Sequence, residues 1–227
     1  MENEIQFSII HPSRSRANWA FQSAQDLINK SSTDLEYIVS VDTTDPQLRN
    51  YEQMFVKLEY KKCKIIIHKN DSKNCVESLN SGAKISTGKV LIYMSDDFLF
   101  PPRWDQLLIG EIQKRTEMKD DFVIWVYDNI QKRIMTICIL SRKYYQRFGY
   151  IYNPLYESMY ADNEYTDVAI LLNKVIDARH LTFKHEHFSV MRKKPDQIYK
   201  IQNDPTRYSK GKEIYEERKK INFGLKI

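Results

Sequence analysis

Glycine is scarce in this chain, which has six glycines among its 227 residues. Loops that wrap phosphate groups with bare backbone need several glycines at fixed spacing, and no such run occurs here. The sequence therefore excludes phosphate loops of the Walker and dinucleotide types. If a nucleotide binds, side chains and strand ends must hold it.

Cysteine is also rare, and the three residues Cys63, Cys75 and Cys138 are scattered along the chain. An odd, scattered set fits neither a disulfide framework nor a zinc site, and it is typical of reduced thiols. No apolar run approaches the roughly 20 residues that span a bilayer. The acidic residues at the start lead straight into a strand pattern, so we expect no signal peptide and a cytoplasmic protein.

The composition indicates one globular unit with a basic end. The net charge is +5, and much of the excess lies in residues 192–227. A basic tail can hold phosphates or nucleic acid. Interleaved acids at Glu213, Glu216 and Glu217 favour the commoner alternative, a solvated helix face. We expect a main domain over residues 1–191 and a basic, partly helical extension over 192–227.

The first hundred residues alternate between strand and helix patterns. Apolar runs predict strands over residues 5–10, 35–41, 63–68 and 89–93. Helical spacing predicts helices over 17–28 and 47–60, and a third that begins near residue 75 behind a capping-box pattern. This alternation is typical of a parallel sheet with helices on both faces.

The second half is less regular. Strand patterns cover residues 122–127, 134–140 and 180–188. Helical patterns cover residues 104–114, 141–148, 166–172 and 212–220. We expect the polar segment after residue 194 to lie at the periphery.

Two adjacent carboxylates, Asp96 and Asp97, follow the apolar strand pattern over 89–93. Ligands of open α/β sheets bind at the carboxyl ends of strands. Neighbouring carboxylates repel each other unless a cation or a hydroxyl-rich ligand satisfies them. The pair therefore predicts a divalent-metal and nucleotide site, with an ordinary surface turn as the alternative.

A second set of candidate ligands is His185 and His187. In a strand they share one face, where two imidazoles can complete a Mn²⁺ site or contact a diphosphate. The alternative is two ordinary surface histidines, and we favour one functional histidine, His187 slightly over His185. Arg14 and Arg16 are candidates for a bidentate phosphate clamp, or else exposed loop charges.

Several segments together resemble the GT-A glycosyltransferases of family 2, over about residues 5–190. The first strand and its polar turn, residues 7–14, resemble that family's nucleotide loop, and Asp42 matches its nucleobase-binding acid. Residues 80–83 and 87–89 resemble the helix and turn before its metal-site strand. Residues 95–98 resemble its DXD region and 162–167 its catalytic acidic motif. Met94 departs from the pattern, because the family usually has an acid there.

The resemblance implies a GT-A fold, with a mostly parallel sheet flanked by helices. It also implies a nucleotide-diphospho-sugar donor, with a UDP-sugar favoured because Asp42 suits a uracil N–H group. The implied cofactor is Mn²⁺ or Mg²⁺ on Asp97 with His187 or His185. Asp96 then faces the ribose hydroxyls or lies in the second coordination shell of the metal. The implied donor-binding residues are His11, Ser13, Arg14, Asp42, Asn80 and Asp96.

A general base is needed to take the proton of the acceptor hydroxyl. Asp162 is our first candidate and Glu164 our second, and the resemblance implies inversion at the anomeric carbon. The alternative for Asp162 is a helix cap. The acceptor stays open between a glycan and a polyanion such as modified DNA. Two other functions stay open as well: a nucleotidyltransferase, and a degenerate domain that only binds nucleotide or nucleic acid.

Overall fold

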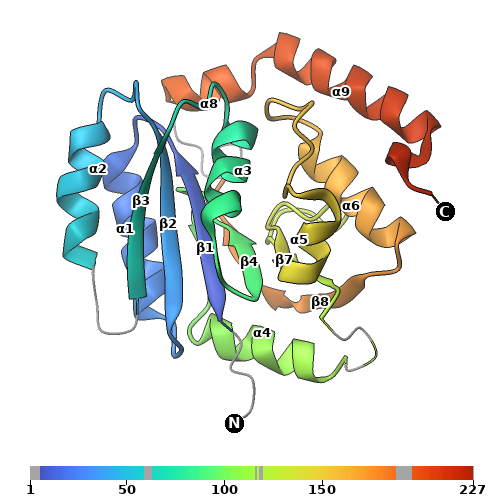
Figure 1. The fold of residues 1–227 in the computed structure, drawn as a ribbon, viewed down its shortest axis with the longest axis horizontal. Helices are drawn as coiled ribbons and strands as arrows, with labels where there is room; N and C mark the ends of the chain where they lie inside the picture. Colours follow the sequence, from blue (N-terminus) through green and yellow to red (C-terminus); the bar gives the residue numbers. More distant parts are fainter. Residues whose placement is uncertain (1–5, 59–62, 116, 118–119, 188–195, 227) are drawn as a thin grey trace.

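The computed structural model describes residues 6–58, 63–115, 117, 120–187 and 196–226. A seven-stranded sheet runs through these residues (Figure 1). In spatial order it contains β3 (Cys63–Asn70), β2 (Leu35–Asp42), β1 (Phe7–Ser13), β4 (Val90–Tyr93), β7 (Ile139–Ser141), β6 (Val123–Tyr127) and β8 (Val175–Thr182). Only the pairings of β7 with its two neighbours are antiparallel. This arrangement confirms the predicted α/β class with a mostly parallel sheet.

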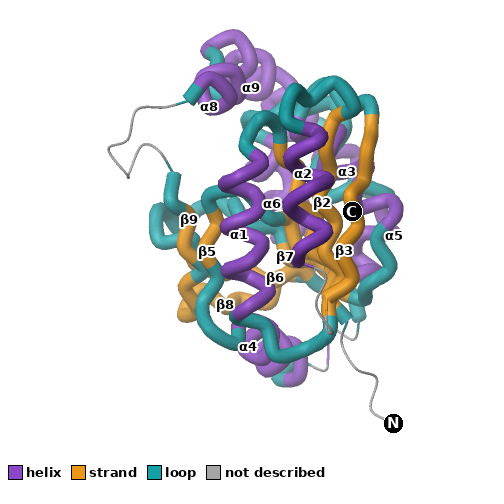
Figure 2. Tube along the Cα trace, turned by 90° about the vertical axis from the view of Figure 1, so that its left-hand side faces the viewer, coloured by secondary structure: helices purple, strands orange, loops and turns teal. Residues whose placement is uncertain are grey.

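Helices cover both faces of the sheet. One face carries α1 (Ala17–Asn29), α2 (Leu48–Phe55) and α4 (Trp104–Gln113). The other carries α3 (Cys75–Ile85), α5 (Arg142–Phe148) and α6 (Ala161–Leu171). Figure 2 shows α1 and α2 side by side against the strands. The inner strands are thus buried on both sides, which explains their nearly continuous apolar sequences, whereas the edge strands β3 and β8 are only partly buried.

The two cores divide the strand residues by alternation. Ile9 of β1 and Ile92 of β4 face the core under α1, whereas Ile10 and Leu91 face the core under α3. Successive side chains of a strand point to opposite faces, so one apolar run supplies both cores.

Local signals set the beginning of α3 as expected. The side chain of Asn74 accepts a hydrogen bond from the backbone N–H of Glu77 at 2.9 Å. The Glu77 carboxylate in turn accepts a bond from the backbone N–H of Lys73 at 2.8 Å. The first bond satisfies a donor that the first helical turn leaves without a partner, and the second ties that turn to the residue before the N-cap.

The C-terminal segment docks onto the rest of the molecule. A short helix, α8 (Gln197–Gln202), and a longer one, α9 (Pro205–Lys220), run across the top of Figure 1, followed by a 3₁₀ turn at Asn222–Gly224. The Arg218 guanidinium donates to both oxygens of Glu164 in α6, at 2.6 and 2.8 Å. Phe223 is buried in the core under α6. Arg218 and Phe223 of this segment are thus packed against the main domain.

Some predicted elements have other limits. The strand expected over 134–140 is confined to Ile139–Ser141, because Thr136 donates to Asp128 at 2.8 Å and holds the preceding residues in a loop. The strand expected over 180–188 is two strands, β8 and β9 (Lys184–His185), and residue 188 lies outside the described residues. β9 pairs with β5 (Phe98–Leu99) in a separate two-stranded sheet.

Helix limits differ for similar reasons. α6 begins five residues before the expected 166, and α9 begins at Pro205 instead of 212. Polar residues dominate both first turns, so apolar spacing does not reveal them. α2 ends at Phe55 and a 3₁₀ turn, Val56–Leu58, follows it; residues 59 and 60 lie outside the described residues.

Within the part of the chain that the structure describes, no helix is both long and apolar enough to cross a bilayer.

Candidate active site

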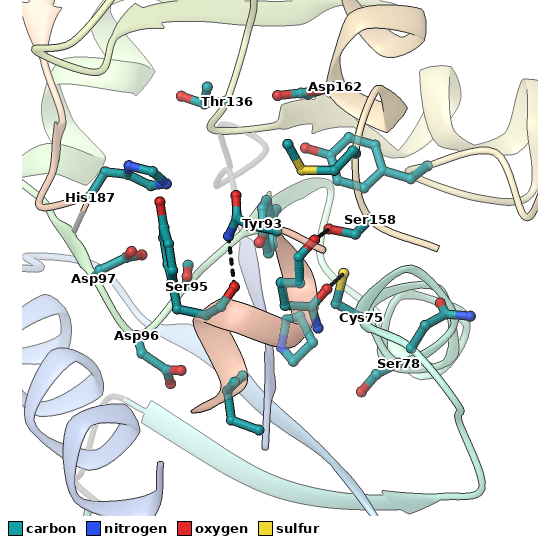
Figure 3. A pocket seen from close by; sticks show the side chains of 18 of the residues that line it. Cys75, Ser78, Tyr93, Ser95, Asp96, Asp97, Thr136, Ser158, Asp162 and His187 are labelled. Carbon is teal, nitrogen blue, oxygen red and sulfur yellow. Dashed lines mark hydrogen bonds between the residues drawn. The ribbon is translucent and has the colours of Figure 1, made fainter. Parts of the chain in front are cut away.

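The carboxyl ends of β1, β2 and β4 open into a cavity of about 680 Å³. This volume is typical of a small-molecule binding site. Residues of β9, the beginning of α6 and the helix α8 complete its walls. Figure 3 shows Asp96 and Asp97 on one side of this cavity and Asp162 with Thr136 above them. The sheet therefore brings the strand acids and the α6 acid, which are distant in sequence, to one space.

Asp96 is held in place by side chains of β1. Its Oδ1 accepts a hydrogen bond from the Ser13 hydroxyl at 2.8 Å and lies 2.9 Å from Nε2 of His11. The other ring nitrogen of His11 lies 2.6 Å from the Tyr37 hydroxyl. His11 is fully buried and does not line the cavity, so it orients Asp96 from behind. Ser13 and Asp96 both reach the cavity wall.

Asp97 is held in its ionised form. Burial alone would raise its pKa, but the hydrogen bond and charge of His185 outweigh burial and lower the pKa to about 2. Its Oδ2 lies 3.3 Å from Nε2 of His185. Its Oδ1 and Nδ1 of His185 are buried and have no hydrogen-bond partner. A buried carboxylate oxygen without a partner is the kind of atom that a cation would satisfy.

The metal-ligand candidates lie next to one another. The rings of His185 and His187 are 5.1 Å apart, and burial lowers the pKa of His187, which favours its neutral, metal-binding form. Within the described ranges, no group of three or more His, Cys, Asp or Glu side chains is arranged to hold a metal ion by itself. The carboxylate of Asp97 and the imidazoles fit Mn²⁺ as a partial donor set that ligand oxygens would have to complete.

Asp162 occupies the first turn of α6 and faces the same cavity. Burial raises the pKa of its carboxyl to about 6, against the opposing effect of the Asn163 backbone N–H, which donates to Oδ1 at 3.0 Å. A carboxyl with this pKa gives up its proton near neutral pH and can accept one from a hydroxyl. The helix cap considered above is not observed, because Asp162 lies inside the helix and Tyr160 is the N-cap residue.

Glu164 and Asn80 lie outside the cavity, which differs from the expectation for both. The Glu164 carboxylate is buried between Arg218, Tyr156 and Asn153. The Asn80 side chain donates to the carbonyl of Tyr152 and accepts from the backbone N–H groups of residues 151 and 152. Both side chains are therefore used to position the loop that precedes α6.

Asp42 and Arg14 form a pair at the open edge of the cavity. Nη1 of Arg14 lies 3.2 Å from Oδ2 of Asp42, and the Arg14 side chain is 45% exposed. Burial opposes ionisation of Asp42, but hydrogen bonds from Thr44 and the charge of Arg14 lower its pKa overall. An ionised Asp42 is an acceptor and matches an N–H donor of a nucleobase.

The sequence did not lead us to predict α8 or its place at the cavity. Ile198, Tyr199 and Ile201 of this helix line the cavity, and Asp196 at its N-cap binds Arg16. The available signal was an aspartate directly before a short apolar pattern, a common N-cap sequence. That signal locates a helix, but it cannot show that the helix returns to the sheet edge.

The family model described as "Glycosyl transferase family 2" matches residues 8–199. The chain therefore belongs to glycosyltransferase family 2, as the resemblance implied, and it is a glycosyltransferase with a GT-A fold. Among curated proteins, no sequence matches this chain.

Solved structures of similar fold include a mannosyltransferase, PcManGT, from Pyrobaculum calidifontis in complex with GDP-Man and Mn²⁺. It is 10% identical, with a TM-score of 0.61 over 96% of this chain and 76% of that one. TarS of S. aureus is 13% identical, with a TM-score of 0.65 over 98% of this chain and 46% of that one. A structure of TarS residues 1–349 with UDP-GlcNAc is 13% identical, with a TM-score of 0.64 over 97% of this chain and 73% of that one. At such identities the likeness concerns the fold.

Proposed function

We propose that this glycosyltransferase moves a sugar from a nucleotide-diphospho-sugar to an acceptor hydroxyl with inversion, assisted by Mn²⁺ or Mg²⁺. One observation carries the proposal: a single cavity contains an ionised Asp97 with an unpartnered oxygen and an Asp162 whose pKa is raised to about 6. These are the two carboxylates that charge stabilisation and proton removal require.

The donor would occupy the strand-end half of the cavity. Asp42 would accept from the nucleobase, and Asp96, which His11 and Ser13 orient, would accept from ribose hydroxyls. A uracil N–H suits Asp42, so we favour a UDP-sugar; two solved structures of similar fold contain UDP-GlcNAc and GDP-Man. Asp97 with His185 and His187 would hold the metal ion, which stabilises negative charge on a leaving diphosphate.

Asp162 would act as the general base. The acceptor oxygen forms a bond to the anomeric carbon while the bond from that carbon to the diphosphate oxygen breaks. The diphosphate leaves with the bonding electron pair, and the acceptor proton passes to the Asp162 carboxylate. A single displacement of this kind inverts the anomeric centre.

The acceptor is proposed from the charges near the cavity. Within the described residues, part of the positive charge of the C-terminal segment is paired: Arg207 and Lys210 share Glu157, and Arg218 lies against Glu164. This pairing favours a glycan hydroxyl over a polyanion such as DNA. A cytoplasmic location stays a prediction.

Thermal unfolding with ligands tests the donor and metal assignments together. We expect UDP or a UDP-sugar with Mn²⁺ to raise the melting temperature, because a ligand that binds only the folded state stabilises it. EDTA and the Asp97→Ala substitution should each abolish this shift. The control is Asp177→Ala, which removes an exposed acid that pairs with Arg179. If no nucleoside diphosphate shifts the wild type, a degenerate domain that binds nucleic acid becomes the better hypothesis. Release of pyrophosphate in turnover assays would indicate a nucleotidyltransferase.

A further inference from the structure

Asp196 joins the short helix α8 to the loop after β1. Its carboxylate accepts a hydrogen bond from the backbone N–H of Tyr199 at 2.7 Å and so caps the helix. Its two oxygens also accept bonds from the guanidinium of Arg16, at 2.8 Å from Nε and 2.7 Å from Nη2. A bidentate pair of this kind fixes both the distance and the orientation of its partners.

Arg16 also reaches the donor half of the cavity. Its Nη1 lies 3.4 Å from Oδ2 of Asp96, and its side chain is only 12% exposed. Burial disfavours its charge, but the two aspartates outweigh burial and raise its pKa above the ordinary value. Arg16 therefore stays charged and connects α8 to the acid that we assign to the ribose.

We call α8 the roof, because it lies across the cavity from one wall to the other. Near its middle, the ring of Tyr199 lies 5.2 Å from that of His187. At its end, the Gln202 side chain accepts from the Cys75 thiol at 3.5 Å, and its carbonyl accepts from Ser158 at 3.4 Å. Figure 3 shows Cys75 and Ser158 on the wall opposite His187 and Asp97.

We propose that Arg16 and Asp196 are positioning residues that keep the roof docked over a bound nucleotide. This inference rests on the proposed function for the identity of the ligand. The cavity beneath the docked roof still measures about 680 Å³, enough for a small ligand, and the roof residues Ile198, Tyr199 and Ile201 line it. A nucleotide that contacts the docked roof stabilises docking, and docking strengthens nucleotide binding by the same factor.

Loss of the Arg16–Asp196 pair would lower the fraction of molecules with a docked roof. The apparent dissociation constant rises in inverse proportion to the fraction of the binding-competent state. We expect about fivefold to tenfold weaker nucleotide binding, mainly through faster dissociation, because changes within one binding site act mostly on the dissociation rate.

The Asp196→Ser substitution separates the ion pair from the helix cap. Serine retains an oxygen that caps the first turn, but it has no charge for Arg16. The matched control is Asp204→Ser at the N-cap of α9, where the aspartate accepts from the backbone N–H of Thr206 at 2.8 Å. Amide hydrogen exchange of residues 197–202 is measured without ligand, and the affinity and dissociation rate of UDP with Mn²⁺ are measured by calorimetry and stopped flow.

We expect faster exchange of the roof and weaker UDP binding in Asp196→Ser but not in Asp204→Ser. Arg16→Gln should show at least these defects, because it also removes the contact with Asp96, and the double variant should be no worse than Arg16→Gln alone. Unchanged exchange of the roof in Asp196→Ser, or equal UDP affinity for wild type and variant, would overturn the proposed role of the Arg16–Asp196 pair. A wild type that binds no nucleotide would instead overturn the proposed function, and with it the coupling between nucleotide binding and docking of the roof. The exchange data would still show whether the Arg16–Asp196 pair keeps the roof docked.

Discussion

At the scale of single residues, we expect the environment of Asp162, the proposed general base, to set the pH dependence of the reaction. Burial raises its pKa to about 6, and a general base acts only when it is deprotonated. We expect kcat/KM to fall about tenfold per pH unit below pH 6 and to level off above it. The Asp162→Asn variant should lose about 10² to 10⁴ in rate and this acid limb together.

The control for this prediction is Asp167→Asn, on the same helix but outside the cavity wall. We expect it to keep the acid limb and to change kcat/KM by less than about threefold. If the residual activity of Asp162→Asn still falls below pH 6, the general base is another group. Both profiles are measured with steady-state kinetics over pH 5 to 9.

Asp162 should also reduce the stability of the fold at neutral pH. Its pKa rises from the ordinary 3.8 to about 6 on folding, so the folded state favours the protonated form. The free energy of unfolding is therefore highest below pH 4, and it falls as the pH rises through 6 and the buried carboxyl ionises. The shift corresponds to an upper limit of about 3 kcal/mol at about 1.4 kcal/mol per unit, which partial exposure reduces to about 1–2 kcal/mol.

We therefore expect Asp162→Asn to be more stable than wild type by about 1–2 kcal/mol at pH 8 and equally stable at pH 4. Urea unfolding at the two pH values measures the difference. A variant that is less stable than wild type at pH 8 would contradict this account. A gain in stability together with a loss of activity is the usual relation at a functional site.

At the scale of elements, two helical glycines predict opposite results for the same substitution. A Cβ added at Gly110 in α4 meets no atom within 4 Å, whereas one at Gly211 in α9 collides with the carbonyl oxygen of Met159. We expect Gly110→Ala to stabilise the protein by about 0.5–1 kcal/mol through helix propensity. Gly211→Ala should destabilise it by about 1–3 kcal/mol, because α9 must move away from the loop that it covers.

Urea unfolding of the two variants is the measurement, and each variant serves as the other's control. Met159 lines the cavity, so Gly211→Ala should also weaken donor binding, while Gly110→Ala should not. Equal stability changes in the two variants would show that α9 does not pack on the Met159 loop as described.

At the scale of the whole molecule, the question is whether the C-terminal segment is an appendage. The sequence predicts a division after residue 191, and the structure docks α9 onto α6 through Arg218, Glu164 and Phe223. We expect a chain that ends at residue 203 to unfold with lost cooperativity or to aggregate, because truncation leaves the buried Glu164 charge without its partner. Calorimetry and size-exclusion chromatography measure this.

A truncated chain that unfolds in one sharp transition, at the temperature of the full chain, would support the predicted division instead.

The sequence by itself determined the fold class and most of the candidate site. Apolar runs bounded by polar turns mark strands whose two faces are both buried, and their order with the helices permits few topologies. Parallel strands share one carboxyl edge, so acids that end strands, such as Asp42, Asp96 and Asp97, must gather there. Ser13 and Asp162 were predicted from the resemblance to family 2, and the structure places both on the cavity wall.

Only the tertiary structure decided which polar side chains reach the cavity. Asp162 and Glu164 are two residues apart, yet one faces the cavity and the other is buried against Arg218. His11 and Asn80 support their neighbours from outside the cavity, and Asp196 of the roof contacts Arg16 across most of the chain length. Such assignments depend on which helix face packs inward and on contacts between distant segments, and no local pattern contains that information.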